Sequence, residues 1–599
     1  MTRSNAAAPR TKARGLTEDV TFDETHDPQL VRRLARFFRP YTGLLTVTVL
    51  SYPAVAIMAL VQPYLVKVAI DRHLMTQNMA GFPAIIALTI GALVLEFGFR
   101  FAQTLLSQNL GQKVTRDLRL ALFRRLQAVD LSYIERNPVG RLMTRVTNDV
   151  ENLSEAFSTG AVSIVGDLFL LGGIVVMMLL LDVELSLFAF TVLPVLVVFV
   201  AFVRVRARVA FRDVRLQLAR MNSFLNEAIG GMSLVQAFRQ EPAMESEFAE
   251  VNGRHRAANV EAIKYDALTY AFVEGLSTVA IAAMLLLGAS LFSSGAVQVG
   301  VFVAFVDYLR RFFQPITELS TKYTVLQSAL ASAERCVDLL DQPVSIQAPD
   351  RAEPVPTLSR GLAFEGVRFR YGDGPEVLRG VDLEIHPAEH VAVVGPTGAG
   401  KSTLVKLVSR FYDPTEGRVS FDGKSLTDFD PAELRSRLAV VLQDPYLFEG
   451  TIRENIMFGS PDATLKQVER AAELTRAIEV IRRQPGGFDA EVGERGGRLS
   501  SGERQLVSFA RALVRDPDVL ILDEATSSVD PETERLIQSG LEHLMENRAA
   551  LIIAHRLSTI ESADRIVVMA RGQVAEEGTH TQLLERGGLY RTLHELQFP

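Results

Sequence analysis

The chain has 599 residues, which predicts about four domain-sized units. Hydrophobic residues make up 48% of the chain and charged residues 22%, and the mean hydropathy is +0.17. This composition is too apolar for an ordinary soluble enzyme and too polar for a chain that lies wholly in lipid. We therefore expect a membrane half joined to a soluble half. The net charge of −7 offers no basic surface for nucleic acid, and the single cysteine, Cys336, excludes a disulfide scaffold.

The first half of the chain is predicted to be a membrane domain behind a polar tail. Residues 1–28 lack the apolar core of a signal peptide, so we expect a disordered cytoplasmic tail. Within 29–330, each of six apolar segments can supply the roughly 20 residues that cross a hydrocarbon core. They are residues 43–66, 82–105, 159–181, 185–204, 268–292 and 298–320. The second and sixth are the weakest, because charged residues interrupt them.

Arginine placement sets the expected orientation. The N-terminal arm and the segments 106–158 and 205–267 are rich in arginine, whereas the linkers near 182–184 and 293–297 have no Lys or Arg. By the positive-inside rule, both termini lie in the cytoplasm and the protein is a multi-pass component of the cell (inner or plasma) membrane. The two arginine-rich segments look helical, so we expect the membrane helices to continue into the cytoplasm, turning near Asn137–Gly140 and Gly230–Gly231.

Several polar residues fall at membrane depth, where burial in lipid is costly. These candidates for substrate contact are Glu96, Asp167, Glu274, Asp307 and Gln314, together with the pair Arg310–Arg311. A cationic compound would favour the acids, and a phospholipid headgroup would favour the arginine pair. The wall of a water-filled cavity, or a position in the cytoplasmic extension, explains these residues equally well.

A proline-rich linker, residues 331–360, precedes alternating strand-like and helical segments over 361–599. Strands are predicted at Leu362–Tyr371, His390–Gly395, Asp518–Glu524 and Ala549–His555. This alternation is typical of an α/β domain.

A glycine-rich turn between a predicted strand and a predicted helix fits the phosphate-loop pattern. Backbone N–H groups and a helix N-terminus face the anion there, Lys401 reaches the β- and γ-phosphates, and Ser402 ligates Mg²⁺. The predicted nucleotide-binding residues of this loop are Gly395, Pro396, Thr397, Gly398, Ala399, Gly400, Lys401, Ser402 and Thr403.

Further candidates follow predicted strands. At the end of the apolar strand 519–522, we expect Asp523 to bind the metal and Glu524 to polarise an attacking water. His555 ends another apolar strand, beside the one that ends in Asp523, where it could contact a γ-phosphate. Gln443 is a weaker candidate, and Tyr371 is either a core aromatic or a platform for an adenine ring.

A second phosphate-binding helix start is predicted at Leu499, Ser500, Ser501, Gly502 and Glu503. Ser500 is a natural N-cap, and the next N–H groups lie at the positive helix end. Since the chain already has one such terminus for its own nucleotide, we expect the second to complete a site on another subunit.

In this order the motifs resemble those of an ABC transporter of the exporter type, a half-transporter with a six-helix all-α transmembrane domain ahead of one α/β P-loop ATPase domain. The resemblance implies ATP and Mg²⁺ as ligands, with Ser402, Gln443 and Asp523 on the metal. It implies catalytic roles for Glu524, His555 and Gln443, adenine stacking by Tyr371, a D-loop at Asp530 and a coupling loop at Gly493–Gly496. Segments near 131–140 and 226–236 resemble coupling helices.

The resemblance also implies two such subunits closing head-to-tail around two ATP molecules. The family signature LSGGQ reads LSSGE here, with Ser501 for a glycine and Glu503 for a glutamine. A carboxylate near a γ-phosphate weakens binding unless it is turned away. We therefore favour a heterodimer, whose partner brings an intact signature, over a homodimer that tolerates the variant.

The expected activity is ATP-driven export of amphipathic small molecules or lipids, which makes the chain an ATP hydrolase coupled to transport. A lipid flippase and a peptide exporter are alternative functions for the same arrangement of domains. An ABC ATPase that gates or signals without vectorial transport is a rival from another class, disfavoured by the presence of Glu524 and His555.

Overall fold

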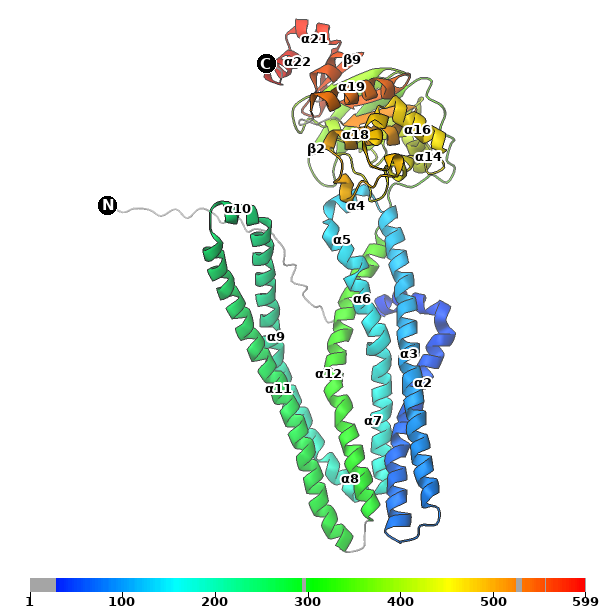
Figure 1. Ribbon diagram of the computed structural model, residues 1–599, viewed down its shortest axis with the longest axis vertical. Coiled ribbons are helices and arrows are strands. Elements are labelled where there is room, and N and C mark those ends of the chain that lie inside the picture. Colours follow the sequence, from blue (N-terminus) through cyan, green and yellow to red (C-terminus); the bar gives the residue numbers. More distant parts are fainter. Residues whose placement is uncertain (1–27, 294–297, 524–529, 555, 598–599) are drawn as a thin grey trace, which may run out of the picture. The chain divides into compact units, whose positions relative to one another are not determined.

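The computed structural model describes residues 28–293, 298–523, 530–554 and 556–597 (Figure 1). The chain divides into two compact units. The first comprises Met1–Gln127 with Val139–Gln342, and the second comprises Ala128–Pro138 with Pro343–Pro599. The predicted order of a helical half and an α/β half is confirmed. The short segment 128–138, expected within a continuous membrane domain, groups with the second unit.

The described residues of the first unit form helices and their connections. The α-helices are α1 (Pro28–Leu34), α2 (Thr42–Ala69), α3 (Phe82–Ala128), α5 (Val139–Val146), α6 (Asn148–Glu155), α7 (Ala161–Leu181), α8 (Val183–Phe190), α9 (Val192–Gly230), α10 (Met232–Ala237), α11 (Glu241–Ser293) and α12 (Val299–Asp341). Short 3-10 and π segments lie at Ala35–Tyr41, Ile70–Leu74 and Ala156–Gly160.

Among the described residues, five helical segments are long and apolar enough to cross a membrane. They are Arg32–Leu74, Phe82–Ala128, Val139–Leu181, Val183–Gly230 and Glu241–Leu286, and they overlap the first five predicted spans. The sixth predicted span lies in α12, where three charged residues between 307 and 311 interrupt the apolar sequence. The helix α12 runs on to Asp341, so the first part of the predicted linker is helical.

Several of these helices are far longer than a bilayer is thick, and α9 and α11 are two of them. α9 has 39 residues and α11 has 53, which correspond to about 58 and 80 Å against a hydrocarbon core of about 30 Å. They lie side by side, with α10 at the turn that joins them (Figure 1). The predicted long hairpin, with its turn at Gly230–Gly231, is therefore confirmed.

Close helix packing holds the membrane unit together. Tyr308 is fully buried and donates a hydrogen bond to the Leu60 carbonyl at 2.6 Å. A Cβ at Gly166 would lie 2.3 Å from the Tyr52 ring, and one at Gly173 would lie 2.4 Å from Leu60. A larger residue at either position would require Tyr52 or Leu60 to move, so these contacts between α2 and α7 favour glycine, as membrane helix pairs favour small residues.

The second unit contains two sheets. A four-stranded antiparallel sheet has the order β2-β1-β4-β5, and a six-stranded sheet has the order β10-β9-β3-β8-β7-β6. In the larger sheet β6, β7, β8, β3 and β9 are parallel, and β10 is antiparallel to β9. The strands are β1 (Leu362–Arg370), β2 (Glu376–Ile385), β3 (His390–Val394), β4 (Glu416–Phe421), β5 (Lys424–Ser425), β6 (Leu438–Val441), β7 (Val519–Asp523), β8 (Ala549–Ile553), β9 (Arg565–Ala570) and β10 (Gln573–Gly578).

Helices surround these sheets. The four strands predicted from the sequence correspond to β1, β3, β7 and β8, whose bounds lie within one or two residues of the predicted ones. The α-helices are α4 (Leu131–Arg136), α13 (Lys401–Val408), α14 (Pro431–Ser436), α15 (Ile452–Met457), α16 (Leu465–Leu474), α17 (Ala477–Arg483), α18 (Ser501–Leu513), α19 (Pro531–Met545), α20 (Leu557–Glu561), α21 (His580–Arg586) and α22 (Leu589–Gln597). Single 3-10 turns lie at Leu426–Asp428, Gly487–Asp489 and Glu494–Gly496.

Candidate active site

Sheet register brings the ends of three neighbouring strands to one level. Val393 of β3 pairs with Ile553 of β8, and Ile553 pairs with Asp523 of β7. Because these strands are parallel, their carboxyl ends share one edge of the sheet, where α/β proteins bind ligands. The chain continues from that edge into the phosphate loop after β3. Glu524 directly follows β7 in sequence, and His555 comes two residues after the end of β8; both lie outside the described residues.

The phosphate loop has the backbone that its glycines predict. Gly395, Gly398 and Gly400 have positive φ angles of 149°, 82° and 103°. A Cβ at Gly395 would lie 2.3 Å from the Met569 carbonyl oxygen, whereas one at Gly398 would meet no atom within 4 Å. The loop is thus packed against β9 at its base and open at its crest, which suits a phosphate on the N-terminus of α13.

Lys401 begins α13 and folds back over this loop. Its Nζ donates to the carbonyls of Gly395 at 2.6 Å and Pro396 at 3.2 Å. Burial lowers the pKa of Lys401, and the charge of Asp523 acts in the opposite direction. Ser402 is exposed beside it. Lys401 thus lies within electrostatic range of Asp523 at the end of β7, and the binding of a nucleotide and its metal by Lys401, Ser402 and Asp523 stays a prediction.

Gln443 is exposed two residues beyond β6, the strand that pairs with β7. It thus follows the same sheet edge as Asp523. Oxygen donors from Ser402, Gln443 and Asp523 are the type that Mg²⁺ prefers, so this donor set fits the metal.

Tyr371 lies in an aromatic cluster next to α13. Its hydroxyl and the Thr403 Oγ1 form a hydrogen bond of 3.1 Å. Its ring meets those of Phe369 and Tyr412 edge-on at centroid distances of 4.8 and 5.3 Å, and the Lys406 Nζ lies 5.2 Å from its centroid. The sequence analysis missed Tyr412 and Lys406. Lys406 could have been found from the sequence, because it lies on α13, the helix that directly follows the phosphate loop.

The first predicted coupling helix, α4, binds this cluster through Glu135. The carboxylate accepts hydrogen bonds from the Lys406 Nζ at 2.8 Å and from the Tyr412 hydroxyl at 2.7 Å. Burial acts to raise the pKa of Glu135, but these two donors outweigh it and hold the pKa below its ordinary value. Glu135 therefore links α4 to the aromatic residues beside the phosphate loop, a contact that nothing in the sequence indicated.

Replacing Tyr371 with alanine is expected to weaken ATP binding by about tenfold or more. Stacking of one base on one aromatic ring is worth about 1–3 kcal/mol by alanine substitution. Tyr371→Phe keeps the ring and loses only the hydrogen bond to Thr403, so its affinity should stay near that of the wild type. Titration with a fluorescent ATP analogue measures both variants. Equal affinities for Tyr371→Ala and the wild type would place Tyr371 in the core alone.

The variant signature forms the start of α18, with Leu499 buried before it. The Ser500 Oγ accepts from the Glu503 N–H at 3.3 Å, and the Glu503 carboxylate accepts from the Ser500 N–H at 2.7 Å. This reciprocal pair is a capping box. The carboxylate of Glu503 is therefore turned toward its own helix terminus and occupies one of the N–H groups there, while Ser501 and Gly502 fill the first turn.

Asp530 is the N-cap of α19. Its carboxylate accepts from the N–H groups of Glu532 and Thr533 at 3.2 and 2.9 Å. These hydrogen bonds lower the pKa of Asp530, and those from Thr533 have the largest effect.

The predicted coupling loop Gly493–Gly496 contains a 3-10 turn in which Arg495 has a positive φ of 51°.

Most of the charged candidates at membrane depth are paired. Glu96 binds Arg100 at 2.9 Å and Asp167 binds Lys322 at 2.5 Å. Asp307 binds Arg311 at 3.0 Å, and Arg311 also donates to the Ala59 carbonyl and to Gln62 of α2. Gln314 and Arg310 are exposed. Glu274 is exposed on α11, and within the described part of the chain it has no ion-pair partner.

Comparison with known proteins gives consistent results for both halves. The family model for the ABC transporter transmembrane region matches residues 45–316, and the model for the ABC transporter ATPase matches residues 378–527. The chain is 37% identical to an uncharacterized ABC transporter ATP-binding protein, YknV, of Bacillus subtilis, with 94% of each chain covered. It is 34% identical to an ATP-dependent lipid A-core flippase of Syntrophus aciditrophicus, with 96% of each covered.

Two further similarities extend this pattern. A probable multidrug resistance ABC transporter protein of Bacillus subtilis, YheH, is 36% identical over 87% of this chain and 77% of its own length. The solved structure of a bacterial Atm1-family ABC exporter with ATP bound superposes with a TM-score of 0.75 at 27% identity, covering 96% of this chain and 99% of that one. With its helical membrane domain and α/β ATPase domain, the chain therefore belongs to the ABC transporters of the exporter type, multi-pass membrane proteins that couple ATP hydrolysis to transport.

Proposed function

We propose that this chain is one half of a dimeric exporter that moves amphipathic small molecules or lipids across the cell membrane by alternating access. The observation that supports this most directly is Glu274, an exposed carboxylate on an apolar helix. A charge at membrane depth is costly unless it faces water or a substrate. Relatives named as a lipid flippase and a multidrug transporter point to the same class of cargo.

Two exposed apolar surfaces support a dimer. The hairpin tip around α10 exposes Ile229, Met232, Leu234 and Phe238, and the surface after β6 exposes Tyr446, Phe448 and Phe458. Exposed apolar patches of this kind mark interaction sites. We infer that the tip of one subunit docks on the aromatic surface of its partner. We also propose that both termini lie in the cytoplasm, on the basis of the arginine distribution.

The variant signature LSSGE favours a heterodimer. Glu503 occupies the Ser500 N–H, and Ser501 adds a side chain where the family signature has glycine. A partner's γ-phosphate would meet a negatively charged carboxylate where the family signature has a neutral amide. The composite site built on this chain's LSSGE is then weak, and the competent site combines this chain's own phosphate loop with an intact signature from a different subunit.

At the competent site, ATP lies on the phosphate loop with its adenine against Tyr371. Ser402, Gln443 and Asp523 would hold Mg²⁺, which would supply positive charge to the phosphates. Lys401 binds the β- and γ-phosphates, Glu524 orients the attacking water, and His555 contacts the γ-phosphate. A peptide exporter, and an ATPase that gates without transport, remain alternatives that the transport assay below distinguishes.

Replacing Glu274 with glutamine is expected to lower transport of a cationic amphipathic dye by about tenfold. A charge pair at a protein–water boundary contributes on the order of 1–4 kcal/mol, which glutamine forfeits. Dye accumulation in inverted proteoliposomes, driven by ATP, measures this. Glu274→Asp should retain transport, and Glu247→Gln, an exposed acid on the cytoplasmic part of the same helix, is the matched control.

Full cation transport by Glu274→Gln would exclude this residue from substrate recognition. Loss of cation transport with unchanged transport of a fluorescent phospholipid would identify cationic compounds as the cargo. ATP-dependent turnover without movement of either probe, in vesicles where a control exporter works, would contradict export of amphipathic compounds. Uptake of a labelled peptide in the same vesicles would then separate a peptide exporter from an ATPase that gates.

A further inference from the structure

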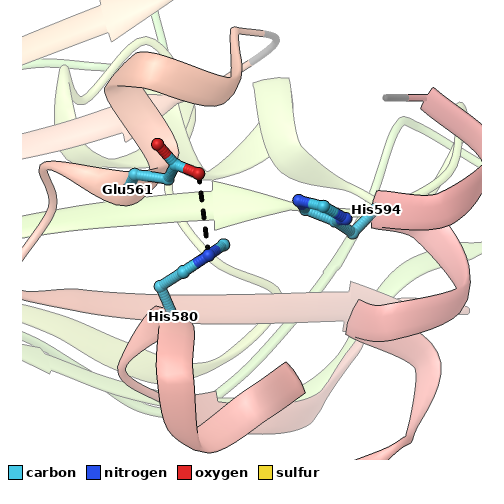
Figure 2. A group of neighbouring side chains, drawn as sticks. All are labelled: Glu561, His580 and His594. Carbon is cyan, nitrogen blue, oxygen red and sulfur yellow. Dashed lines mark ion pairs between the residues drawn. The ribbon is translucent and has the colours of Figure 1, made fainter. Parts of the chain in front are cut away.

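Two histidines and a glutamate converge near the C-terminus of the described chain, at a place distinct from the residues proposed to bind ATP. Glu561 ends α20, His580 begins α21 and His594 lies on α22 (Figure 2). One ligand atom from each lies within 4.8 Å of the other two, and within the described residues no other group of three such side chains is this close. We propose that Glu561, His580 and His594 bind a divalent transition-metal ion of the Zn²⁺ type.

The spacing fits a shared metal ion better than a direct contact. The His580 Nε2 lies 3.7 Å from the Glu561 Oε1, beyond the 2.7–3.2 Å typical of an N–H···O hydrogen bond. Two ligands of one tetrahedral Zn²⁺, bound at about 2.0–2.2 Å, are about 3.4 Å apart. The Figure 2 view shows the His580 ring directed at the Glu561 carboxylate, with the His594 ring beside them.

A hydrogen bond on the far side of the His580 ring supports this role. The Nδ1 lies 2.7 Å from the hydroxyl of Tyr590, which is buried. When Nδ1 donates to that oxygen, Nε2 presents its lone pair toward Glu561. Metal-binding histidines typically have their second nitrogen fixed in this way.

The surrounding structure holds the third ligand in place. The carboxylate of Glu576 on β10 accepts from the N–H groups of Leu589 and Tyr590 at 2.5 and 3.0 Å, which anchors the start of α22. The side chains of His580 and Glu561 are 23% and 48% exposed, so an ion can enter from solvent and keep water as a further ligand. Two imidazoles and one carboxylate with an open position suit Zn²⁺ and related divalent ions.

Co²⁺ titration of the full-length protein, purified in detergent without a histidine tag, tests the site. We expect one Co²⁺ per chain with visible ligand-field absorption, displaced by Zn²⁺. His594→Gln and Glu561→Gln each remove a ligand and should weaken binding at least tenfold. Tyr590→Phe removes only the orienting hydroxyl and should weaken it about 10–100-fold, as other second-layer partners of metal ligands do.

His386→Gln is the matched control, because His386 also lies beside a carboxylate, Glu384, at 3.8 Å, but outside any such trio in the described residues. It should bind Co²⁺ like the wild type. Thermal unfolding of each variant without metal establishes that its fold is intact. The proposal is overturned if the wild type takes up no Co²⁺ at micromolar concentrations, or if Glu561→Gln and His594→Gln bind it as tightly as the wild type.

Discussion

Replacing Glu524 with glutamine is expected to lower ATP turnover by on the order of 10²–10⁴-fold while ATP affinity stays within about twofold, since a positioned general base contributes a factor of that size. Glutamine has nearly the same shape but cannot accept the proton of the attacking water. Asp523, which we propose as a metal ligand at the end of β7, is unchanged, so the nucleotide site should still assemble. Phosphate release in lipid nanodiscs and binding of a fluorescent ATP analogue measure the two quantities separately.

Glu542→Gln provides the control for this variant, because it removes an exposed carboxylate from α19 without touching the sheet edge. Its turnover should match that of the wild type. Near-normal turnover in Glu524→Gln would mean that another group activates water. Loss of ATP binding together with turnover would instead assign Glu524 a structural role, which also contradicts the mechanism proposed.

The sequence predicted the nucleotide-site scaffold well because its signals are local. A run such as Val391–Val394 before three glycines and Lys401 fixes a strand, a turn and a helix start through backbone requirements alone. The order of β3, β8 and β7 in the sheet, by contrast, depends on long-range pairing. Family order supplied that arrangement to the prediction, and the register then aligned Val393, Ile553 and Asp523.

Contacts between distant segments were invisible in the sequence. Glu135 binds Lys406 and Tyr412 across more than 270 positions, and no periodicity or motif marks it. The pairing of Asp167 with Lys322 is similar, since each residue read alone is only a charge inside an apolar helix. Glu503 differs from these two cases, because its contact is local and its spacing in the sequence indicates it. Its charge suggested repulsion of phosphate, while its actual hydrogen bond is local and follows from the S-x-x-E spacing of a capping box.

That capping box makes the signature an informative place for a gain-of-function experiment. The double change Ser501→Gly and Glu503→Gln restores LSGGQ, and we expect it to raise the ATPase rate of this chain, purified alone in nanodiscs, by at least about tenfold. Removing the carboxylate eliminates its repulsion of a γ-phosphate, which is large in a partly desolvated site. Glutamine can still serve as the third residue of a capping box, so α18 should remain folded.

The single change Glu503→Gln separates charge from shape. If the carboxylate alone weakens the composite site, this variant should recover much of the rate, and Ser501→Gly alone should recover little. The oligomeric mass must be determined for each sample, because a composite site needs two chains. Combining the restored signature with Glu524→Gln should abolish the gained activity, which would show that it arises at this chain's own nucleotide sites.

The wild-type rate decides between the two assemblies. A dimeric, ATP-binding but nearly inactive wild type, activated by the restored signature, would show that LSSGE cannot complete a competent site, so that the natural partner must bring a different signature. High Glu524-dependent turnover from wild-type dimers, unchanged or reduced by the restoration, would show that LSSGE is functional and that the chain works as a homodimer. In that case the Glu503 carboxylate, held by the Ser500 N–H, would leave enough donors at the start of α18 to bind the partner's phosphate.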